Sequence, residues 1–461
     1  MDFDKISSYL SKLNFYADIR IISSVNSSFS LEDEKIMCAS GETDGIGVRT
    51  LINGSFGYAW STNINDFPKL IKKAEKLARI NKGIFSLSHE KSENAEIGKN
   101  FEFPDFNEKI VMMKEAKKYA LSAKTKNTSL FLCDSNVKKI FMNNNGSCIV
   151  QKESYVYFSA VCVAKEGIEL QKGHERLASR NGYGNFDIAK TAQNAKERAE
   201  RLLNSHSPPK GRFLVIMDPE MSGIFTHEAL GHASEGDSVA EQESMLAGKL
   251  GKKIASEKVS IIDDPTFDGF GRYFYDDEGV RARPVLIVEN GVLKNYLHSR
   301  QSATAVRNFA SRNFKTKKPK PKTQNSELET ISNGHARAED YEFAPIVRMS
   351  NTFFLKGNER KSDVFDVKEG IYVIGMKGGS VDIFNGDFMF AAKEGWLIKN
   401  GSKEKLLRDV TISGNIFESL ARVESVGNNF MTSPGFCGKM GQSVPVSDGG
   451  PYVRVSEMKI G

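Results

Sequence analysis

Apolar residues recur at helical spacing in four stretches of the first half of the chain, at residues 3–13, 68–80, 107–123 and 187–203. A repeat of three to four residues places these side chains on one face of a helix, so each stretch predicts an amphipathic helix. Between them, apolar and polar residues alternate, most clearly at 17–25 and within 128–164. Alternation predicts strands with one buried face, and the Asn144-Asn145-Gly146 sequence predicts a hairpin turn.

The second half shows a different pattern, with short apolar runs separated by glycines. Asn290-Gly291 between two such runs predicts a tight hairpin. The polar stretch at 205–209 contains Pro208 and Pro209 and predicts a domain boundary. We therefore expect an α+β protein of two domains. Residues 1–206 are expected to form an α/β sandwich-like N-terminal domain. Residues 207–461 are expected to form a mostly β C-terminal domain, which carries a helix with candidate metal ligands (the metal helix, from Asp218 to His232).

Composition narrows the classes of function. Hydrophobic residues make up 39% of the 461 residues and charged residues 26%, as in a soluble globular protein. The net charge of +6 is too small to indicate nucleic acid as a partner. The five cysteines are scattered and odd in number, which indicates a reducing compartment. The start of the chain has no apolar signal core, and no run of 18 apolar residues follows, so we expect a cytoplasmic protein without a membrane span.

One helix carries candidate metal chemistry. An apolar run at residues 212–217 predicts a strand, and Asp218 and Pro219 after it are typical of an N-cap and a first helical residue. The helix continues through His227 and Glu228 to His232. Two imidazoles can hold a metal ion, and the carboxylate next to the first can activate a water molecule.

The spacing of the two histidines is unusual. At i and i+5 on a regular α-helix they lie roughly 140° apart, too far to share an ion. A π-type turn brings them to within roughly 50°, and Gly231 inside the motif makes such a distortion easier. We therefore predict a π-bulge or a helix break between His227 and His232. The alternative is that His232 is an ordinary half-buried histidine.

A third ligand is available near the C-terminus. Cys437 lies between Gly435 and Gly438 in a glycine-rich segment, where the backbone can approach an ion closely. Two histidines and one thiolate leave a tetrahedral zinc ion one open position, which is the pattern of catalytic sites. The alternative is a buried free cysteine.

Together these motifs resemble the TldD/PmbA metallopeptidases. The resemblance covers nearly the whole chain and rests on HEALGHASEGD (227–237), DDEGV (276–280), ENGVL (289–293), RMSNT (348–352), GGSVD (378–382) and GKMGQSVP (438–445), with DGIGVR (44–49) and GYA (57–59) in the N-terminal half. TldD-like members of the family carry the His-Glu-x-x-x-His motif and the distant cysteine, whereas their sister subunits lack both. The resemblance thus implies that His227, His232 and Cys437 are metal ligands and that Glu228 is the general base.

The expected activity is metal-dependent hydrolysis of short or unfolded peptides. One Zn²⁺ per chain suits imidazole and thiolate ligands, and Fe²⁺ is the alternative because His/His/Cys sites with a neighbouring glutamate also occur in iron-dependent peptide deformylases. The resemblance implies a dimer, either a homodimer or a heterodimer with a metal-free TldE/PmbA-like sister subunit. The competing hypothesis is a non-enzymatic regulatory protein, similar to a DNA gyrase modulator, with a structural metal site.

Other residues are weaker candidates. Gly378 and Gly379 would let a peptide backbone lie against a strand, and Arg337 or Arg348 would bind a substrate carboxylate; turns and structural arginines are the alternatives. Glu235 and Asp237 are candidate partners for an imidazole N–H. The lysine-rich tract from Lys315 to Lys322 predicts a surface loop, and attraction of acidic partners or nucleic acid is the second interpretation.

Overall fold

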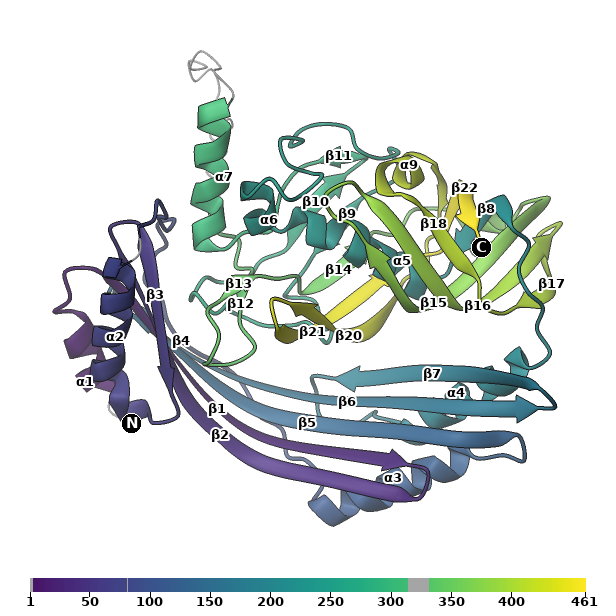
Figure 1. Ribbon diagram of the computed structural model, residues 1–461, viewed down its shortest axis with the longest axis horizontal. Helices are drawn as coiled ribbons and strands as arrows, with labels where there is room; N and C mark the ends of the chain where they lie inside the picture. The colour runs from purple at the N-terminus through teal and green to yellow at the C-terminus, as the bar shows by residue number, and fades with distance from the viewer. Residues whose placement is uncertain (1–2, 81, 314–330) are drawn as a thin grey trace.

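The computed structural model describes residues 3–80, 82–313 and 331–461. The N-terminal half is built around long strands with four α-helices. Its elements are α1 (Phe3–Leu10), β1 (Tyr16–Glu32), β2 (Lys35–Ile52), β3 (Ser55–Ser61), α2 (Phe67–Ile80), β4 (Asn94–Gly98), α3 (Phe106–Ala120), β5 (Thr125–Asn143), β6 (Cys148–Glu166), β7 (Glu169–Ser179) and α4 (Ile188–Leu202). Figure 1 shows the long strands side by side in one curved sheet, with the C-terminal half over one of its faces.

The strands of this sheet follow the order β3-β2-β1-β5-β6-β4, and β7 also pairs with β6. All pairs are antiparallel except β4 with β6. Residues of β6 alternate between buried and partly exposed along most of the strand, as in a sheet with one fully covered face. The predicted strand at 17–25 is confirmed but extends to Glu32. The polar run Ser27-Ser28 hid this extension, which pairing with both β2 and β5 stabilises.

The helices of the N-terminal half cover one face of the sheet. The buried odd-numbered residues of β1, from Ala17 to Leu31, belong to two hydrophobic clusters on this face, one packed with α1 and α2 and the other with α3 and α4. The even-numbered Asp18 and Arg20 are buried on the opposite face. That face therefore has to be covered by another part of the chain.

The C-terminal half covers it through buried polar contacts. Arg49 donates to Asp18 (Nε to Oδ2, 2.9 Å) on the neighbouring strand and to Glu278 of the C-terminal half (Nη1 to Oε1, 2.7 Å). Glu278 also accepts the backbone N–H of Arg300 at 2.6 Å. These groups are almost fully buried. Because buried charges are costly unless they are paired, the network favours one relative placement of the two halves.

The C-terminal half consists mainly of strands, as predicted; most are short, but two, at 369–381 and 387–399, extend over 13 residues each. Its elements are β8 (Gly211–Met217), α5 (Pro219–Thr226), a π-turn (His227–Gly231), a 3₁₀ turn (His232–Ser234), α6 (Gly236–Ala240), β9 (Ile261–Asp263), β10 (Val285–Glu289), β11 (Val292–Leu293), α7 (Arg300–Asn313), β12 (Ala336–Arg337), β13 (Ile346–Val347), β14 (Asn351–Phe354), α8 (Lys361–Val364), β15 (Glu369–Val381), β16 (Asp387–Lys399), β17 (Ser402–Leu407), β18 (Thr411–Asn415), α9 (Ile416–Ala421), β19 (Val423–Val426), β20 (Met431–Lys439), β21 (Gln442–Gly450) and β22 (Val453–Ile460).

Two sheets of this half enclose helix α5. Strands β15, β8, β22, β18 and β16 pair in this order, and β16 pairs again with β15, which closes a ring. The second sheet has the order β11-β10-β9-β14-β21-β20. Phe225 of α5 packs against Phe388 and Phe390 of β16, with ring centroids 5.3 and 6.2 Å apart. On its other side, Gly223 lies so close to Gly449 of β21 that a methyl group on it would come within 2.4 Å of the Gly449 nitrogen.

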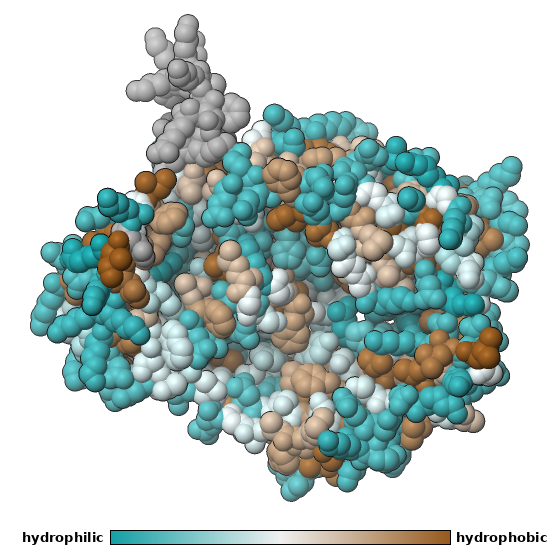
Figure 2. Space-filling view, in the orientation of Figure 1, coloured by the Kyte–Doolittle hydropathy of each residue, from teal (hydrophilic) through white to brown (hydrophobic). Residues whose placement is uncertain are grey.

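Several expectations are confirmed. The fold is α+β, and the Asn290-Gly291 hairpin joins β10 to β11 with both turn residues at positive φ, 47° and 78°, as a type I′ turn requires. The domain boundary at residue 206 stays a prediction. The tract from Lys315 to Lys322 lies outside the described residues. None of the helices in the described ranges is long and apolar enough to cross a membrane. Hydrophilic residues dominate the face shown in Figure 2, where hydrophobic side chains form separate small patches.

Candidate metal centre

The metal helix begins as predicted. The Asp218 carboxylate accepts the backbone N–H of Met221 at 2.8 Å, and Pro219 occupies the first helical position. Asp218 Oδ1 also accepts the N–H of Gly375 on β15 at 2.9 Å. The cap thus satisfies a free N–H of the first turn and joins the helix to the closed ring of strands.

The predicted distortion between the two histidines is confirmed, and of the two expected forms, a π-bulge and a helix break, the structure has the π-type turn. Residues 227–231 form a π-helical turn, in which the backbone N–H of His232 donates to the carbonyl of His227 five residues earlier. The imidazole rings lie 5.1 Å apart between centroids, at 88° to one another. A side chain at Gly231 would collide with the Met349 sulfur, since an added Cβ would lie 1.9 Å from it. The absent side chain therefore allows the turn to pack against Met349.

The third predicted ligand lies at the same place. Cys437 is on β20, which pairs with β21, and its sulfur lies 3.5 Å from Nε2 of His232. The ligand atoms of His227, His232 and Cys437 all lie within 4.8 Å of one another. Cys437 is 205 residues from His232 in sequence, so only the packing of the β20–β21 hairpin against α5 brings them together.

A carboxylate lies next to Nδ1 of each imidazole. His227 Nδ1 lies 2.7 Å from Oδ1 of Asp448, and His232 Nδ1 lies 3.2 Å from Oε2 of Glu235. A carboxylate at Nδ1 favours the tautomer that carries its proton on this nitrogen, so that Nε2 keeps a lone pair. For His232, this Nε2 is the atom that lies next to the Cys437 sulfur.

The electrostatics of the three side chains are coupled. Burial acts to raise the pKa of the Cys437 thiol, but the two neighbouring imidazoles outweigh it and lower the pKa to about 5. Burial acts in the opposite direction on His232, and Glu235 and Cys437 overcome it and raise the pKa to about 10. Asp448 and Cys437 likewise raise the pKa of His227 well above its usual value, against burial. The three side chains therefore favour the thiolate form of Cys437 and attract positive charge, either protons or a metal ion.

These residues fit a metal ion. A thiolate and two imidazoles in a buried cluster, with a carboxylate behind each imidazole, form the donor set that zinc takes in catalytic sites. A cation bound among them would replace the protons that the isolated cluster holds. The alternative explanations for His232 and Cys437 do not require their side chains to meet, whereas the structure places them together.

Glu228 differs from its neighbours in the same turn. It is partly exposed, whereas His227 and residues 229–231 are buried. Among the residues that the structure describes, none donates a hydrogen bond or forms an ion pair with its carboxylate. A carboxylate next to a candidate metal ligand and without a partner among the described residues is available to exchange protons with solvent or substrate.

The two candidate arginines bind backbone carbonyls of the strands near Cys437. Arg348 is fully buried, and its guanidinium donates to the backbone carbonyls of Cys437 and Gln442, the latter at 3.3 Å. Arg337 donates to the carbonyls of Met349 (2.7 Å) and Pro445 (2.9 Å). Both hold the strands around the cysteine through their backbones. Binding of a substrate carboxylate by either stays a prediction, which these contacts do not favour.

The remaining candidate residues, Glu235, Asp237, Gly378 and Gly379, lie in different local environments. Glu235 is the predicted imidazole partner, whereas both carboxylate oxygens of Asp237 accept from Lys439 at 2.8 and 2.9 Å. Gly378 and Gly379 are exposed on β15, which pairs with β16 along this stretch and with β8 only over 371–373. Asp448 and Lys439 were not predicted. No spacing signal connects Asp448 with His227, because register within the β20–β21 hairpin decides its position.

Comparison with known proteins identifies the family. Three models match consecutive parts of the chain: PmbA/TldA metallopeptidase domain 1 at residues 17–78, the central domain at 99–203 and the C-terminal domain at 210–461. The chain belongs to the PmbA/TldD metallopeptidase family. This assignment confirms the resemblance, and the matched segments together span most of the chain.

Relatives of this family member are named metalloproteases. A "Metalloprotease" of Methanothermobacter thermautotrophicus is 38% identical over 455 residues, covering 97% of this chain and 95% of the relative. A "Zinc metalloprotease TldD homolog" of Saccharolobus solfataricus is 30% identical over 454 residues, covering 97% and 96%. Among solved structures, TldE from Thermococcus kodakarensis has the same fold, with a TM-score of 0.75, 20% identity and 99% coverage of each chain.

Proposed function

We propose that this protein is a metal-dependent peptidase that hydrolyses short or unfolded peptides. The observation that carries the proposal is the meeting of His227, His232 and Cys437, whose ligand atoms lie within 4.8 Å of one another. A site with three protein ligands leaves a tetrahedral ion one position for water or substrate. A purely structural zinc site would have a fourth protein ligand.

Zinc is the proposed metal, with iron(II) as the alternative, at one ion per chain. Bound by these three side chains, it would lower the pKa of a water molecule and polarise the scissile carbonyl. The protein's own contribution begins with orientation. Asp448 and Glu235 hold the two imidazoles by Nδ1, and Arg348 fixes the Cys437 carbonyl.

Glu228 is the proposed general base. Its partly exposed carboxylate, which has no partner among the described residues, takes a proton from the attacking water and passes it to the leaving amine nitrogen. The exposed backbone at Gly378 and Gly379 is proposed to take an extended peptide segment by strand addition. Arg337 or Arg348 would bind a substrate carboxylate only after giving up carbonyl contacts, and we rank them below the glycines.

Association is proposed as well. The fold similarity to TldE supports pairing with a metal-free sister subunit, and a homodimer is the alternative arrangement. Sedimentation of the purified chain alone and after co-expression with a TldE-like subunit distinguishes the two.

Metal content tests the site directly. Mass spectrometry of purified wild type should find about one zinc or iron per chain, and Cys437→Ala should lose most of it. Cys162→Ala is the matched control, because Cys162 is also a buried free thiol but lies in the N-terminal half. Equal metal in all three proteins would overturn the assignment of Cys437, and no metal uptake by wild type would overturn the metal site.

The competing function is a regulatory protein, similar to a DNA gyrase modulator, in which the metal is structural. That function requires no hydrolysis of any peptide by metal-loaded protein, alone or with a sister subunit. It also requires Glu228→Gln to behave as wild type in every assay. Release of new amino termini from an unfolded protein substrate, abolished by a chelator and restored by zinc, would exclude it.

A further inference from the structure

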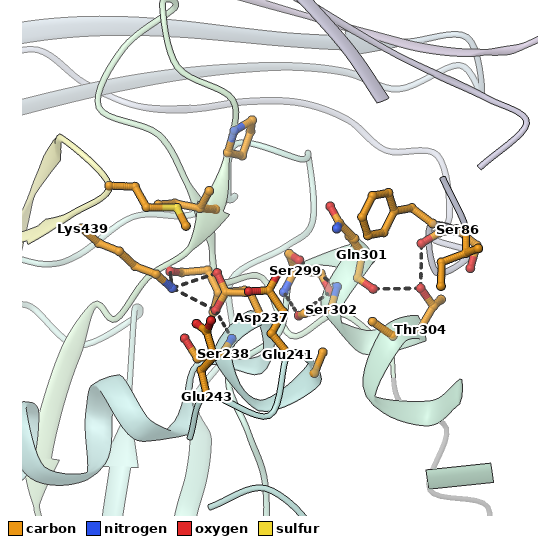
Figure 3. A pocket seen from close by; sticks show the side chains of 18 residues that line it. Ser86, Asp237, Ser238, Glu241, Glu243, Ser299, Gln301, Ser302, Thr304 and Lys439 are labelled. Carbon is orange, nitrogen blue, oxygen red and sulfur yellow. Dashed lines mark hydrogen bonds and ion pairs between the residues drawn. The ribbon is translucent and has the colours of Figure 1, made fainter. Parts of the chain in front are cut away.

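A cavity of about 380 Å³ lies beside the metal centre and contains none of the metal ligands. Its walls come from α6, the first turns of α7, β13, the tip of the β20–β21 hairpin and residues 84–86 of the N-terminal half. Figure 3 shows Asp237, Glu241 and Lys439 toward one end and Ser86 and Thr304 at the other. Segments distant in sequence thus enclose one space.

The cavity is connected to a metal ligand by a short chain of contacts. Lys439 lines the cavity, and its Nζ lies 3.0 Å from Oε2 of Glu235. The same carboxylate oxygen lies 3.2 Å from Nδ1 of His232. One buried carboxylate therefore separates the lysine in the wall from the metal centre, so a group bound in the cavity would lie close to the reacting bond.

The charge of the lining is negative. Asp237, Glu241 and Glu243 line the cavity together with Lys439 as its cation. Lys439 is already neutralised by Asp237 and Glu235. Burial, Glu243 and Asp237 each raise the pKa of Glu241. Within the described ranges, neither Glu241 nor Glu243 has a side-chain ion pair or hydrogen bond, and Lys439 acts on Glu241 only at longer range, so two carboxylates at the cavity lack a contacting cation.

The rest of the lining mixes polar side chains, such as Ser302 and Thr304, with exposed apolar ones. Ile84, Phe85 and Met440 are 78%, 43% and 74% exposed, and all three border the cavity. Apolar side chains gathered around one cavity on a protein surface often mark a binding site. Next to unpaired carboxylates, they match a ligand with an aliphatic stem and a cationic head.

We propose that this cavity binds the side chain of a lysine or arginine residue of a peptide substrate, with its stem against Phe85 and Met440 and its head at Glu241 and Glu243. The volume accommodates either side chain, and charge complementarity selects a cation over a neutral or acidic group. The proposal rests on the proposed peptidase function and gives that peptidase a preference for basic peptides.

Binding is tested separately from hydrolysis. Zinc-loaded Glu228→Gln protein is titrated with fluorescent peptides that differ at one position, where lysine is replaced by norleucine. The lysine peptide should bind about fivefold to tenfold more tightly at low salt, and the preference should shrink at high salt. Adding Glu241→Gln and Glu243→Gln should remove the preference and leave the affinity for the norleucine peptide unchanged.

The matched control carries Glu369→Gln and Glu404→Gln, which remove the same charge from exposed positions on β15 and β17. This control should keep the preference. Equal binding of both peptides to the unmodified cavity would overturn the proposal even if wild type hydrolyses peptides. A lysine preference without hydrolysis by wild type would support the cavity and contradict the peptidase.

Discussion

Asp448 lies 2.7 Å from Nδ1 of His227, on the side of the imidazole opposite Nε2. Its position depends on the close approach of Gly223 to Gly449, the neighbour of Asp448 on β21. A carboxylate at this nitrogen fixes the tautomer and orientation of a ligating histidine. We therefore expect Asp448→Asn to lower zinc affinity by about 10-fold to 100-fold, measured by competition with a chromophoric chelator.

The control for this experiment is Asp409→Asn, because Asp409 is exposed and pairs with Lys377 at the surface. It should bind zinc as wild type does. Equal affinity in wild type and Asp448→Asn would show that His227 does not need this carboxylate.

Glu228→Gln separates metal binding from chemistry. The amide keeps the size of the side chain but cannot take a proton from water, so kcat/KM for a peptide should fall by at least about 100-fold. Zinc content should stay at the wild-type level, because Glu228 is not among the clustered ligands. Turnover that survives the substitution would place the general base elsewhere.

The π-turn needs glycine at position 231. An added methyl group would overlap the Met349 sulfur, and overpacking of this kind costs roughly 1–3 kcal/mol. Gly231→Ala should therefore lower the free energy of unfolding, measured by chemical denaturation, by that amount. The same substitution in a Met349→Ala background should cost less, since the space is then free. Gly184→Ala is the control, because nothing lies within 4 Å of its added Cβ.

Glu278 holds the two halves of the molecule together. Glu278→Ala would leave Arg49 with Asp18 as its remaining carboxylate partner and would remove the acceptor of the Arg300 N–H. Breaking a buried pair in this way costs roughly 3–5 kcal/mol of stability. Glu115→Ala removes an exposed pair with Lys118 and should change stability by less than about 1 kcal/mol. Similar losses in both variants would contradict the role of the buried network.

His298 makes stability depend on pH. Burial, with a smaller effect of His335, lowers its pKa to about 3, whereas an unfolded histidine has a pKa of about 6.5. Between these values the unfolded chain binds the extra proton, so stability falls as the pH falls below about 6.5. Relative to His298→Gln, wild type should lose about 1.4 kcal/mol of unfolding free energy between pH 7.5 and 5.5. Parallel pH profiles of the two proteins would contradict this assignment.

Much of the local structure was predictable because it depends on short-range chemistry. Asp218 and Pro219 specify a helix start through capping and a fixed φ. Asn290 and Gly291 specify a tight hairpin because both adopt positive φ. The i, i+5 spacing of His227 and His232 is compatible with a shared site only if the helix is distorted between them, so the sequence predicted a π-bulge or a helix break there.

Prediction failed where polar sequence forms regular structure. The alternation of β1 disappears in its serine-rich middle, yet pairing on both edges carries the strand on to Glu32. The surroundings of Arg348 were also not predictable: the structure buries it and directs its guanidinium to backbone carbonyls, and its role toward a substrate carboxylate stays a prediction. A sequence shows that an arginine is present, not which acceptors surround it.

The sequence by itself determined the helix carrying His227, Glu228 and His232, the need for a distortion between the histidines and the candidate cysteine. Only the tertiary structure decided that Cys437 meets His232, that Asp448 lies beside His227 and that Lys439 and Glu235 connect the candidate metal centre with a neighbouring cavity. The physical reason is the distance along the chain over which each interaction acts. Capping, turn conformation and helical periodicity act over a few residues, whereas these contacts join side chains about 200 to 220 residues apart in the chain. The packing of α5 against the β20–β21 hairpin brings them together.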